Sequence, residues 1–286
     1  MSETGWAIRV PASSANLGAG FDVLGMALSL YADVGPVGDD ADPPAGAHVA
    51  EETHPATVAF RRLGGAGDLW VRSPIPMGRG LGFSGSVRVG GAVAAVVQHD
   101  GPSSLDDADV VAEVLAVTTE LEGHADNVAP SLLGGVVVCA GGGVVPVPMV
   151  LDPAVVVWIP DGTTTSTDQS RAQLPTTVPM TDAVFNLGRV ATFVAACASG
   201  DAAALRRGTE DRLHQPIRLA AVPTSAAALD AALDAGAWAA WLSGSGPTVA
   251  VLCDPGRADE LAAALPDDGH TKLLRIAAEG TVVITA

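Results

Sequence analysis

Residues 76–86 read Pro76-Met77-Gly78-Arg79-Gly80-Leu81-Gly82-Phe83-Ser84-Gly85-Ser86 and lead directly into an apolar run, 87–97. The stretch holds four glycines and two serines. Glycine lets consecutive backbone N–H groups approach an anion, and a following helix turns the positive end of its dipole toward the same charge. The pattern predicts a loop that binds the phosphates of a nucleotide through Pro76, Gly78, Arg79, Gly80, Leu81, Gly82, Phe83, Ser84, Gly85 and Ser86.

A glycine-rich loop before a helix also occurs as a tight turn without a ligand, and that alternative stays open for the loop alone. Two known phosphate loops are excluded. A Walker A loop needs Gly-Lys-Ser/Thr, but the only lysine of the chain is Lys272. A protein-kinase loop would be followed by Val-Ala-Ile-Lys and His-Arg-Asp, and neither is present.

Three further segments are unusually polar for this chain: 11–25 (PASSANLGAGFDVLG), 120–130 (ELEGHADNVAP) and 242–248 (LSGSGPT). With the loop at 76–86, they resemble in order and spacing the motifs of the GHMP small-molecule kinases, most closely the homoserine kinases. Residues 166–171 (STDQSR), 185–186 (FN) and 210–216 (EDRLHQP) resemble the actinobacterial members of that family. The resemblance therefore extends over nearly the whole chain.

Composition is compatible with such a protein. The chain has 286 residues, 48% of them hydrophobic, and 15 basic against 32 acidic residues give a net charge of −17. This charge disfavours nucleic acid and anionic membranes as partners. Cys139, Cys197 and Cys253 are scattered and resemble buried apolar residues rather than metal ligands. Without a signal core or a run of about 18 apolar residues, we expect a cytoplasmic protein with a small-molecule substrate; a homodimer is left open.

Hydrophobic periodicity predicts an α+β fold. We expect strands at 6–10, 25–34, 70–73, 134–139, 144–150, 154–159, 238–242, 248–252 and 273–284, and helices at 87–99, 104–121, 181–199, 201–214, 225–235 and 254–264. Pro and Asp near 150–153 suggest a boundary between domains 1–150 and 151–286. The resemblance implies a GHMP kinase fold: an ATP-binding N-terminal domain like domain 2 of ribosomal protein S5, a ferredoxin-like C-terminal domain, and substrates in the cleft between them.

Phosphoryl transfer needs an anion cradle, a divalent cation and a clamp on the acceptor. The resemblance places Ser84 and Glu120 at the family's metal-binding positions, and hard oxygen donors suit Mg²⁺. We therefore expect ATP as the phosphoryl donor and Mg²⁺ held by Ser84 and Glu120. The alternative for Glu120 is a solvated acid at a helix end.

The resemblance also implies an acceptor clamp. Asn16 and Asp22 suit an ammonium and a hydroxyl, whereas Arg171 and Arg218 offer planar forks for a carboxylate. The alternatives are Asx turns for the first two residues and surface solvation for the arginines. Further binding residues are predicted at His124, Asn127, Thr167, Gly244 and Gly246, although 244–247 could also be a hairpin turn.

Asn127 stands where related mevalonate kinases place a catalytic aspartate, and an amide cannot act as a general base. We therefore expect transfer without a dedicated base, with Asp126 as the rival base and with Asn127, Glu120, Ser84 and Arg171 as catalytic residues. Two departures from the family, Phe83 in place of a serine and Arg88 in place of a small neutral residue, bear on nucleotide handling.

The predicted reaction is the ATP-dependent phosphorylation of L-homoserine to O-phospho-L-homoserine, a step toward threonine. The alternatives are a GHMP kinase for another small hydroxy or amino acid, and a homologue that binds a ligand without turnover.

Overall fold

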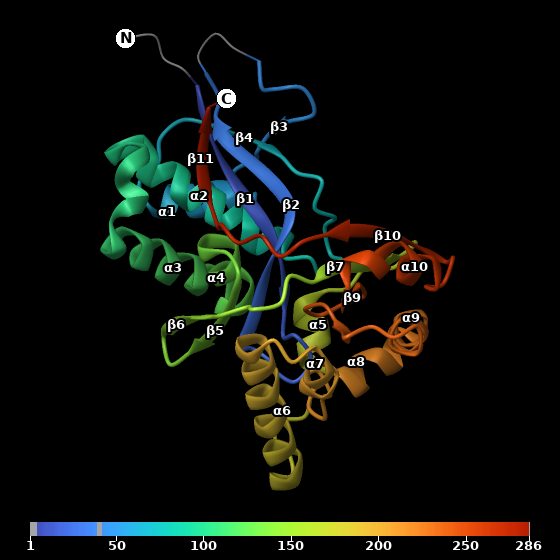
Figure 1. The fold of residues 1–286 in the computed structure, drawn as a ribbon. Helices are drawn as coiled ribbons and strands as arrows, with labels where there is room; N and C mark the ends of the chain where they lie inside the picture. The colour runs from blue at the N-terminus through green and yellow to red at the C-terminus, as the bar shows by residue number, and fades with distance from the viewer. Residues whose placement is uncertain (1–4, 39–41, 286) are drawn as a thin grey trace.

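The computed structural model describes residues 5–38 and 42–285, which form two antiparallel sheets with helices packed on each (Figure 1). The first sheet is covered by four helices and the second by the helices near the C-terminus. Among these residues, no helix combines the length and the apolar character needed to cross a membrane.

The first sheet is organised around two long strands, β1 (Trp6–Ala15) and β2 (Leu24–Pro36), whose register pairs Ile8 with Val34 and Ala15 with Gly25. The strand order is β11-β1-β2-β4-β3, and β5 pairs with both β2 and β6. The bounds of these strands are β3 (His48–Val49), β4 (Leu69–Arg72), β5 (Val136–Ala140), β6 (Gly143–Val147) and β11 (Val282–Thr285).

Helix α2 (Phe83–Asp100) is the central helix on this sheet and contacts both long strands. Most of its residues from Gly85 to Val97 are buried, because its surface is apolar on nearly all sides. It is flanked by α1 (Pro55–Arg62), η1 (Pro102–Asp106), α3 (Ala108–Glu122) and α4 (Ala125–Leu133). Helix α3 begins at the Asp107 cap, whose side chain accepts from the backbone N–H of Asp109, and ends at Gly123 with φ 89°.

The second sheet has the order β10-β7-β9-β8. Its strands are β7 (Ala154–Pro160), β8 (Ala239–Leu242), β9 (Val249–Cys253) and β10 (Gly269–Leu274). The helices of this part are α5 (Thr167–Ala172), α6 (Met180–Ser199), α7 (Ala202–Gly208), α8 (Gln215–Ala221), α9 (Pro223–Asp234), η2 (Pro255–Arg257) and α10 (Ala258–Ala263).

Most of the predicted elements are present, with shifted ends, and four α-helices were not predicted. These are α1, α4, α5 and α8; each has nine residues or fewer and so offers too few turns for a helical period to stand out. The predicted helix 201–214 is wrong in its second half, because α7 ends at Gly208 and Asp211 binds the backbone N–H groups that follow.

The predicted strand region 273–284 is wrong as a single strand. Its beginning is the end of β10 in the second sheet, whereas β11 pairs with β1 in the first. The chain therefore returns to the first sheet at its C-terminal end, and a division into 1–150 and 151–286 does not follow the sheets.

Candidate active site

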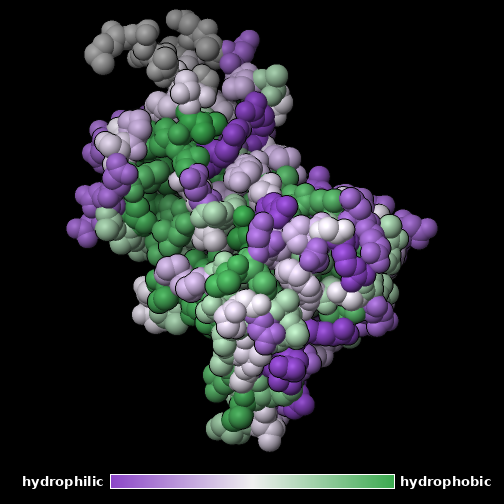
Figure 2. Space-filling model, viewed as in Figure 1, coloured by the Kyte–Doolittle hydropathy of each residue, from purple (hydrophilic) through white to green (hydrophobic). Residues whose placement is uncertain are grey.

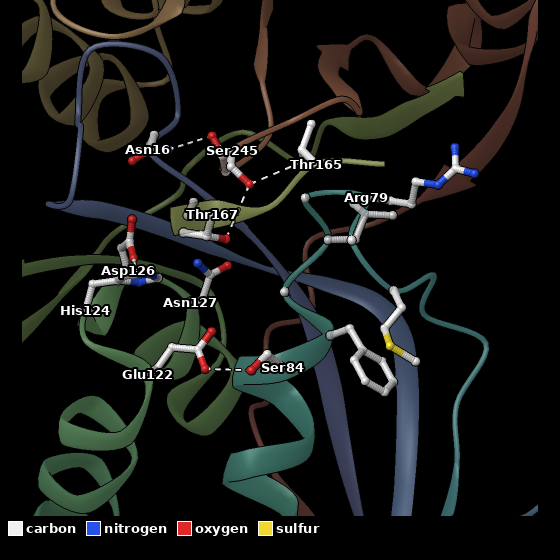
Figure 3. Close-up of a pocket in the computed structure, with 18 of the residues that line it drawn as sticks. Asn16, Arg79, Ser84, Glu122, His124, Asp126, Asn127, Thr165, Thr167 and Ser245 are labelled. Carbon is white, nitrogen blue, oxygen red and sulfur yellow. Dashed lines mark hydrogen bonds and ion pairs between the residues drawn. The ribbon is translucent and has the colours of Figure 1, made fainter. Parts of the chain in front are cut away.

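A cavity of about 300 Å³ lies where loops from both sheets meet. Its lining comes from the loop after β1, the glycine-rich loop before α2, the α3–α4 junction and the segments 165–171 and 244–245 (Figure 3). This volume is within the range of small-ligand sites. The motifs that were quoted from separate parts of the sequence thus converge on one cavity.

The glycine-rich loop passes close to Ser13 and Ser243. Gly78, Gly80 and Gly82 have φ values of 65°, 74° and 67°, which favour glycine. A Cβ on Gly82 would overlap the Ser13 hydroxyl, and one on Gly80 would overlap the Ser243 carbonyl. The loop can therefore take this path only because these side chains are missing.

Gly82 is also the N-cap of α2, and no side chain caps this helix end. The N–H groups of the first turn and the positive end of an 18-residue helix thus face the cavity wall. Such an end binds phosphate well.

Eight of the ten predicted nucleotide-binding residues line the cavity, from Pro76 to Ser84, and two do not. Ser86 is buried and its hydroxyl donates to the Phe83 carbonyl, while Gly85 packs against Asn127. Arg79 lines the cavity with its backbone region, but its guanidinium turns away and donates to the Pro160 carbonyl (Figure 3).

Glu120, which we expected to hold Mg²⁺, does not reach the cavity. Glu120 is 66% exposed, lies outside the cavity lining and forms an ion pair with Arg62 at 3.4 Å. Glu122 lies in the cavity instead, and its Oε2 accepts from the Ser84 hydroxyl at 2.8 Å. Two residues correspond to more than half a helical turn, so the two carboxylates point to different sides of α3.

Ser84 and Glu122 fit Mg²⁺ as two hard oxygen donors placed side by side. The described residues contain no cluster of three or more His, Cys, Asp or Glu that could hold a metal. Mg²⁺ is often held by one or two protein groups together with phosphates and waters.

Asp22 and Arg171 form a bidentate ion pair, with N–O distances of 2.6 and 2.7 Å. The hydrogen bond to Asp22 raises the pKa of Arg171. Asn16 supports this pair rather than facing open space: its Oδ1 accepts from the Asp22 N–H and its Nδ2 donates to the Gly244 carbonyl. Asn16 and Asp22 both have positive φ, 73° and 58°, a strained backbone that is held by these bonds.

Arg218 is 3% exposed and lines the cavity. Its Nη1 donates to the Gly244 carbonyl at 3.1 Å and contacts His214 Nδ1 at 3.3 Å, but its buried Nε has no partner among the described residues. No Asp or Glu carboxylate of the described residues lies within 4.0 Å of the Arg218 guanidinium, and burial lowers the pKa of Arg218. An unpaired buried cation is costly unless an anion joins it.

An aromatic ring connects the two arginines. The guanidinium carbons of Arg171 and Arg218 each lie 5.3 Å from the centre of the Phe21 ring, and His214 stacks on the same ring. Burial lowers the pKa of His214, so it is a neutral ring whose Nε2 donates to the Gly18 carbonyl.

The first turn of α4 supplies Asp126 and Asn127, and His124 caps it. Asp126 is 2% exposed and its carboxylate bonds to His124 Nδ1 at 2.9 Å, which raises the pKa of His124. The Asn127 Oδ1 accepts from Ser13 at 3.0 Å. All three side chains line the cavity (Figure 3).

Thr167 and Gly244 also line the cavity, whereas Gly246 does not. The Gly246 carbonyl accepts from the Thr165 hydroxyl, so Gly246 joins the segment 242–248 to the segment that precedes α5. The prediction missed Ser13, Phe21, Glu122, Thr165 and Ser245. Four of these are inside the quoted motifs, one to three positions from a residue that was chosen, so their place in the motif was the available signal.

Comparison with known proteins agrees with this arrangement. The family models for the GHMP kinases N terminal domain and for GHMP kinases C terminal match residues 48–135 and 193–271. A homoserine kinase of Moorella thermoacetica is 40% identical over 86% of both chains, and one of Desulfitobacterium hafniense is 37% identical over 97% of this chain and 99% of that protein.

Solved structures extend the comparison. The crystal structure of homoserine kinase from Cytophaga hutchinsonii superimposes with a TM-score of 0.82 at 25% identity, covering 99% of this chain and 98% of that one. The predicted GHMP kinase fold is therefore confirmed. A mevalonate kinase structure, with a TM-score of 0.66 at 14% identity, shares the fold alone. The chain belongs to the GHMP kinases and, within them, to the homoserine kinase family.

Proposed function

We propose that the protein transfers the γ-phosphoryl group of ATP to the side-chain hydroxyl of L-homoserine, giving O-phospho-L-homoserine and ADP in the cytoplasm. The observation that carries the choice of acceptor is Arg218, a buried guanidinium that lines the cavity without a carboxylate partner among the described residues. An amino-acid carboxylate would supply that partner.

The Asp22–Arg171 pair supports recognition of the other charges of the acceptor. An amino acid carries an ammonium and a carboxylate a few ångströms apart. The ammonium can therefore pair with Asp22 and the carboxylate with Arg171. Asp22 would take the ammonium while Arg171 and Arg218 share the carboxylate. Bound homoserine would give Asp22 an ammonium partner and both arginines one shared carboxylate, whereas an acceptor without a carboxylate would leave both arginines unpaired.

The donor end would be the glycine-rich loop. Its glycines and the N-terminus of α2 would hold the phosphates, and Ser84 with Glu122 would hold Mg²⁺. When bound, this ion neutralises the charge that develops on the transferred group. The apolar wall formed by Pro55, Met77 and Phe83 supports a place for the nucleotide base.

The proton is proposed to move without a protein base. The acceptor oxygen bonds to the γ-phosphorus as the bond to the ADP oxygen breaks, and the hydroxyl proton passes to the transferred phosphate. Asn127 would orient the hydroxyl, because its amide is fixed by Ser13 at 3.0 Å. Asp126 is already bonded to His124, which leaves it less available as a base.

Acceptor analogues test this proposal. L-Homoserine should turn over, while 3-aminopropanol, which lacks the carboxylate, should lose at least about 100-fold in kcat/KM, because the buried Arg218 stays unpaired. 4-Hydroxybutyrate, which lacks the ammonium that Asp22 would bind, should lose less, about tenfold, because Asp22 keeps its pair with Arg171. Arg218→Met should erase the preference for homoserine over 3-aminopropanol. Arg206→Met, which removes an exposed arginine, is the matched control. Equal turnover of all three acceptors would contradict the proposal.

We further propose that two copies pair through α6. Met180, Val184 and Leu187 are 77%, 59% and 70% exposed and lie at helical spacing on the outer side of this helix, where a surface helix is normally polar. Figure 2 shows hydrophobic residues on this projecting end of the molecule. In an antiparallel two-fold pair, Val184 would face Leu187 of the second copy.

Sedimentation equilibrium tests the pairing. The protein should sediment as a dimer and Leu187→Glu as a monomer, since a charge would enter the apolar contact. A monomeric protein at micromolar concentration would contradict it.

A further inference from the structure

Arg88 contacts the candidate metal carboxylate from outside the cavity. Its Nε donates to Glu122 Oε2 at 2.7 Å, and the Ser84 hydroxyl donates to the same oxygen at 2.8 Å. Arg88 stands four residues after Ser84 on α2, so the two side chains lie on one face of that helix. The side chains of Arg88 and Glu122 are only 19% and 13% exposed.

This ion pair compensates a charge that is unfavourable in two ways. Glu122 is the last residue of α3, where the helix dipole is negative and a carboxylate is destabilised. It also lies beside the loop proposed to hold phosphates, where an uncompensated carboxylate would repel a nucleotide. Asp22 and Asp126, the other carboxylates of the lining, are paired with Arg171 and His124. Arg88 compensates the charge of Glu122 in the same way.

The charge of Arg88 also acts on the cavity wall. His54 lines the cavity, and its pKa is lowered by burial first, then by the charges of His48 and Arg88. The positive charge of Arg88 therefore also attracts phosphates bound by the neighbouring glycine-rich loop.

We infer that Arg88 is a positioning residue that acts as a resident cation: it holds Glu122 against the glycine-rich loop, strengthens binding of metal-free nucleotide and weakens binding of a divalent cation to the empty site. The inference rests on the proposed function in placing the nucleotide phosphates at Ser84 and Glu122. Two charges of one sign compete for one carboxylate, so a fixed guanidinium lowers the affinity for a metal ion, whereas it adds to the attraction for an anion.

The arrangement leaves one carboxylate oxygen available. Oε2 of Glu122 accepts both hydrogen bonds, and Oε1 has no hydrogen bond within the described residues. Arg88 therefore fixes the orientation of the carboxylate without blocking it. A lysine would keep the charge but not the directed Nε–H bond.

The test measures binding rather than turnover. AMP-PNP affinity is determined by calorimetry in EDTA, and Mn²⁺ affinity by electron paramagnetic resonance without nucleotide. In Arg88→Gln, we expect AMP-PNP to bind about tenfold more weakly and Mn²⁺ about tenfold more tightly, the size of one partly screened charge interaction. Arg88→Lys should keep most of both wild-type affinities. Arg62→Gln is the matched control, since it breaks the exposed pair with Glu120 and should change neither affinity.

A double variant keeps the inference testable if Arg88→Gln fails to fold with Glu122 unpaired. R88Q/E122Q removes both charges, so its affinity for metal-free AMP-PNP should return to within about threefold of wild type, since the net charge at the site is restored. Unchanged affinities in both variants would overturn the inference, as would a double variant as weak as R88Q, because Arg88 would then bind the nucleotide directly.

The outcome is separable from the proposed function. Arg88-dependent binding in a protein that phosphorylates no homoserine would support the inference and contradict the function. Homoserine turnover with Arg88-independent binding would do the reverse. A folded protein that binds no AMP-PNP would overturn both.

Discussion

At the scale of single residues, the cavity is a set of charges that compensate one another in pairs. Arg171 pairs with Asp22 and Arg88 with Glu122, and His124 bonds to Asp126, which raises the pKa of His124. Arg218 stands apart, because no carboxylate of the described residues pairs with it. This imbalance is the basis of the proposed preference for an acceptor that carries a carboxylate.

The His124–Asp126 pair predicts a pH-dependent stability. The hydrogen bond to Asp126 raises the pKa of His124 above 6.5, so folding favours its protonated form. The stabilisation is fully present below pH 6.5 and is lost as pH rises through the raised pKa. His124→Gln should therefore lower the free energy of unfolding more at pH 5.5 than at pH 9, as measured by urea unfolding. An equal loss at both pH values would mean that the pair is uncharged.

Asp126 and Asn127 allow the base-free transfer to be tested. In Asp126→Asn, the new amide oxygen can still accept from His124, so the local packing is kept while the rival base is removed. We expect kcat within about fivefold of wild type, far less than the 10²–10⁴-fold that general bases contribute. A loss of about a thousandfold in a folded variant would make Asp126 the base.

Residue identity in the site was predictable only where the motif fixes it. Asn16, Asp22, Ser84, Asn127, Arg171 and Arg218 all reach the cavity or its edge. The choice between Glu120 and Glu122 was not predictable in the same way, because both are acids in the last turn of one helix and only the direction of each side chain separates them.

At the scale of elements, the close packing of α1 on α2 depends on Gly91. Its Cβ position is occupied by the Ala56 carbonyl, so the backbones of the two helices approach each other directly. A buried glycine in an apolar helix signals such an approach in the sequence, but the sequence does not say which element approaches. The short α1, which makes this contact, was itself missed.

Two glycine-to-alanine variants measure this contact. Gly91→Ala should destabilise the protein by about 1–3 kcal/mol, because a well-packed contact must open. Gly188→Ala, in the exposed part of α6 with nothing near its Cβ position, should instead stabilise by about 0.5–1 kcal/mol through backbone entropy. Urea unfolding of both variants checks the pair. A neutral Gly91→Ala would mean that α1 and α2 do not pack this closely.

At the scale of the whole molecule, a chain of buried hydrogen bonds joins the two sheets to the phosphate loop. The Trp241 indole N–H on β8 donates to Ser14 on β1 at 2.9 Å, Ser14 bonds to Ser243 at 2.7 Å, and Ser243 donates to the Gly80 carbonyl at 2.6 Å. The bonded residues are 163 to 229 positions apart in the chain, so no local sequence pattern could predict these contacts. These bonds fix the glycine-rich loop to strands of both sheets, at the cleft that the family resemblance implies.

Trp241→Phe tests the role of this chain of bonds. Loss of the indole N–H leaves the buried Ser14 short of a donor, which should cost about 1–3 kcal/mol and loosen the anchor of Gly80. We expect lower stability together with weaker binding of AMP-PNP. Trp158→Phe is the control, since its indole bonds to the Pro266 carbonyl inside the second sheet region. It should lower stability without changing nucleotide binding, and equal effects on binding would contradict the account.

The most direct test of the central claim is ATP turnover by the purified protein with Mg²⁺, with the product identified by ³¹P NMR. L-Homoserine is compared with L-serine, L-threonine, pantoate and no acceptor. We expect formation of O-phospho-L-homoserine with clear selectivity for homoserine. Turnover of another acceptor in its place, or binding of ATP and homoserine without any turnover, would contradict it.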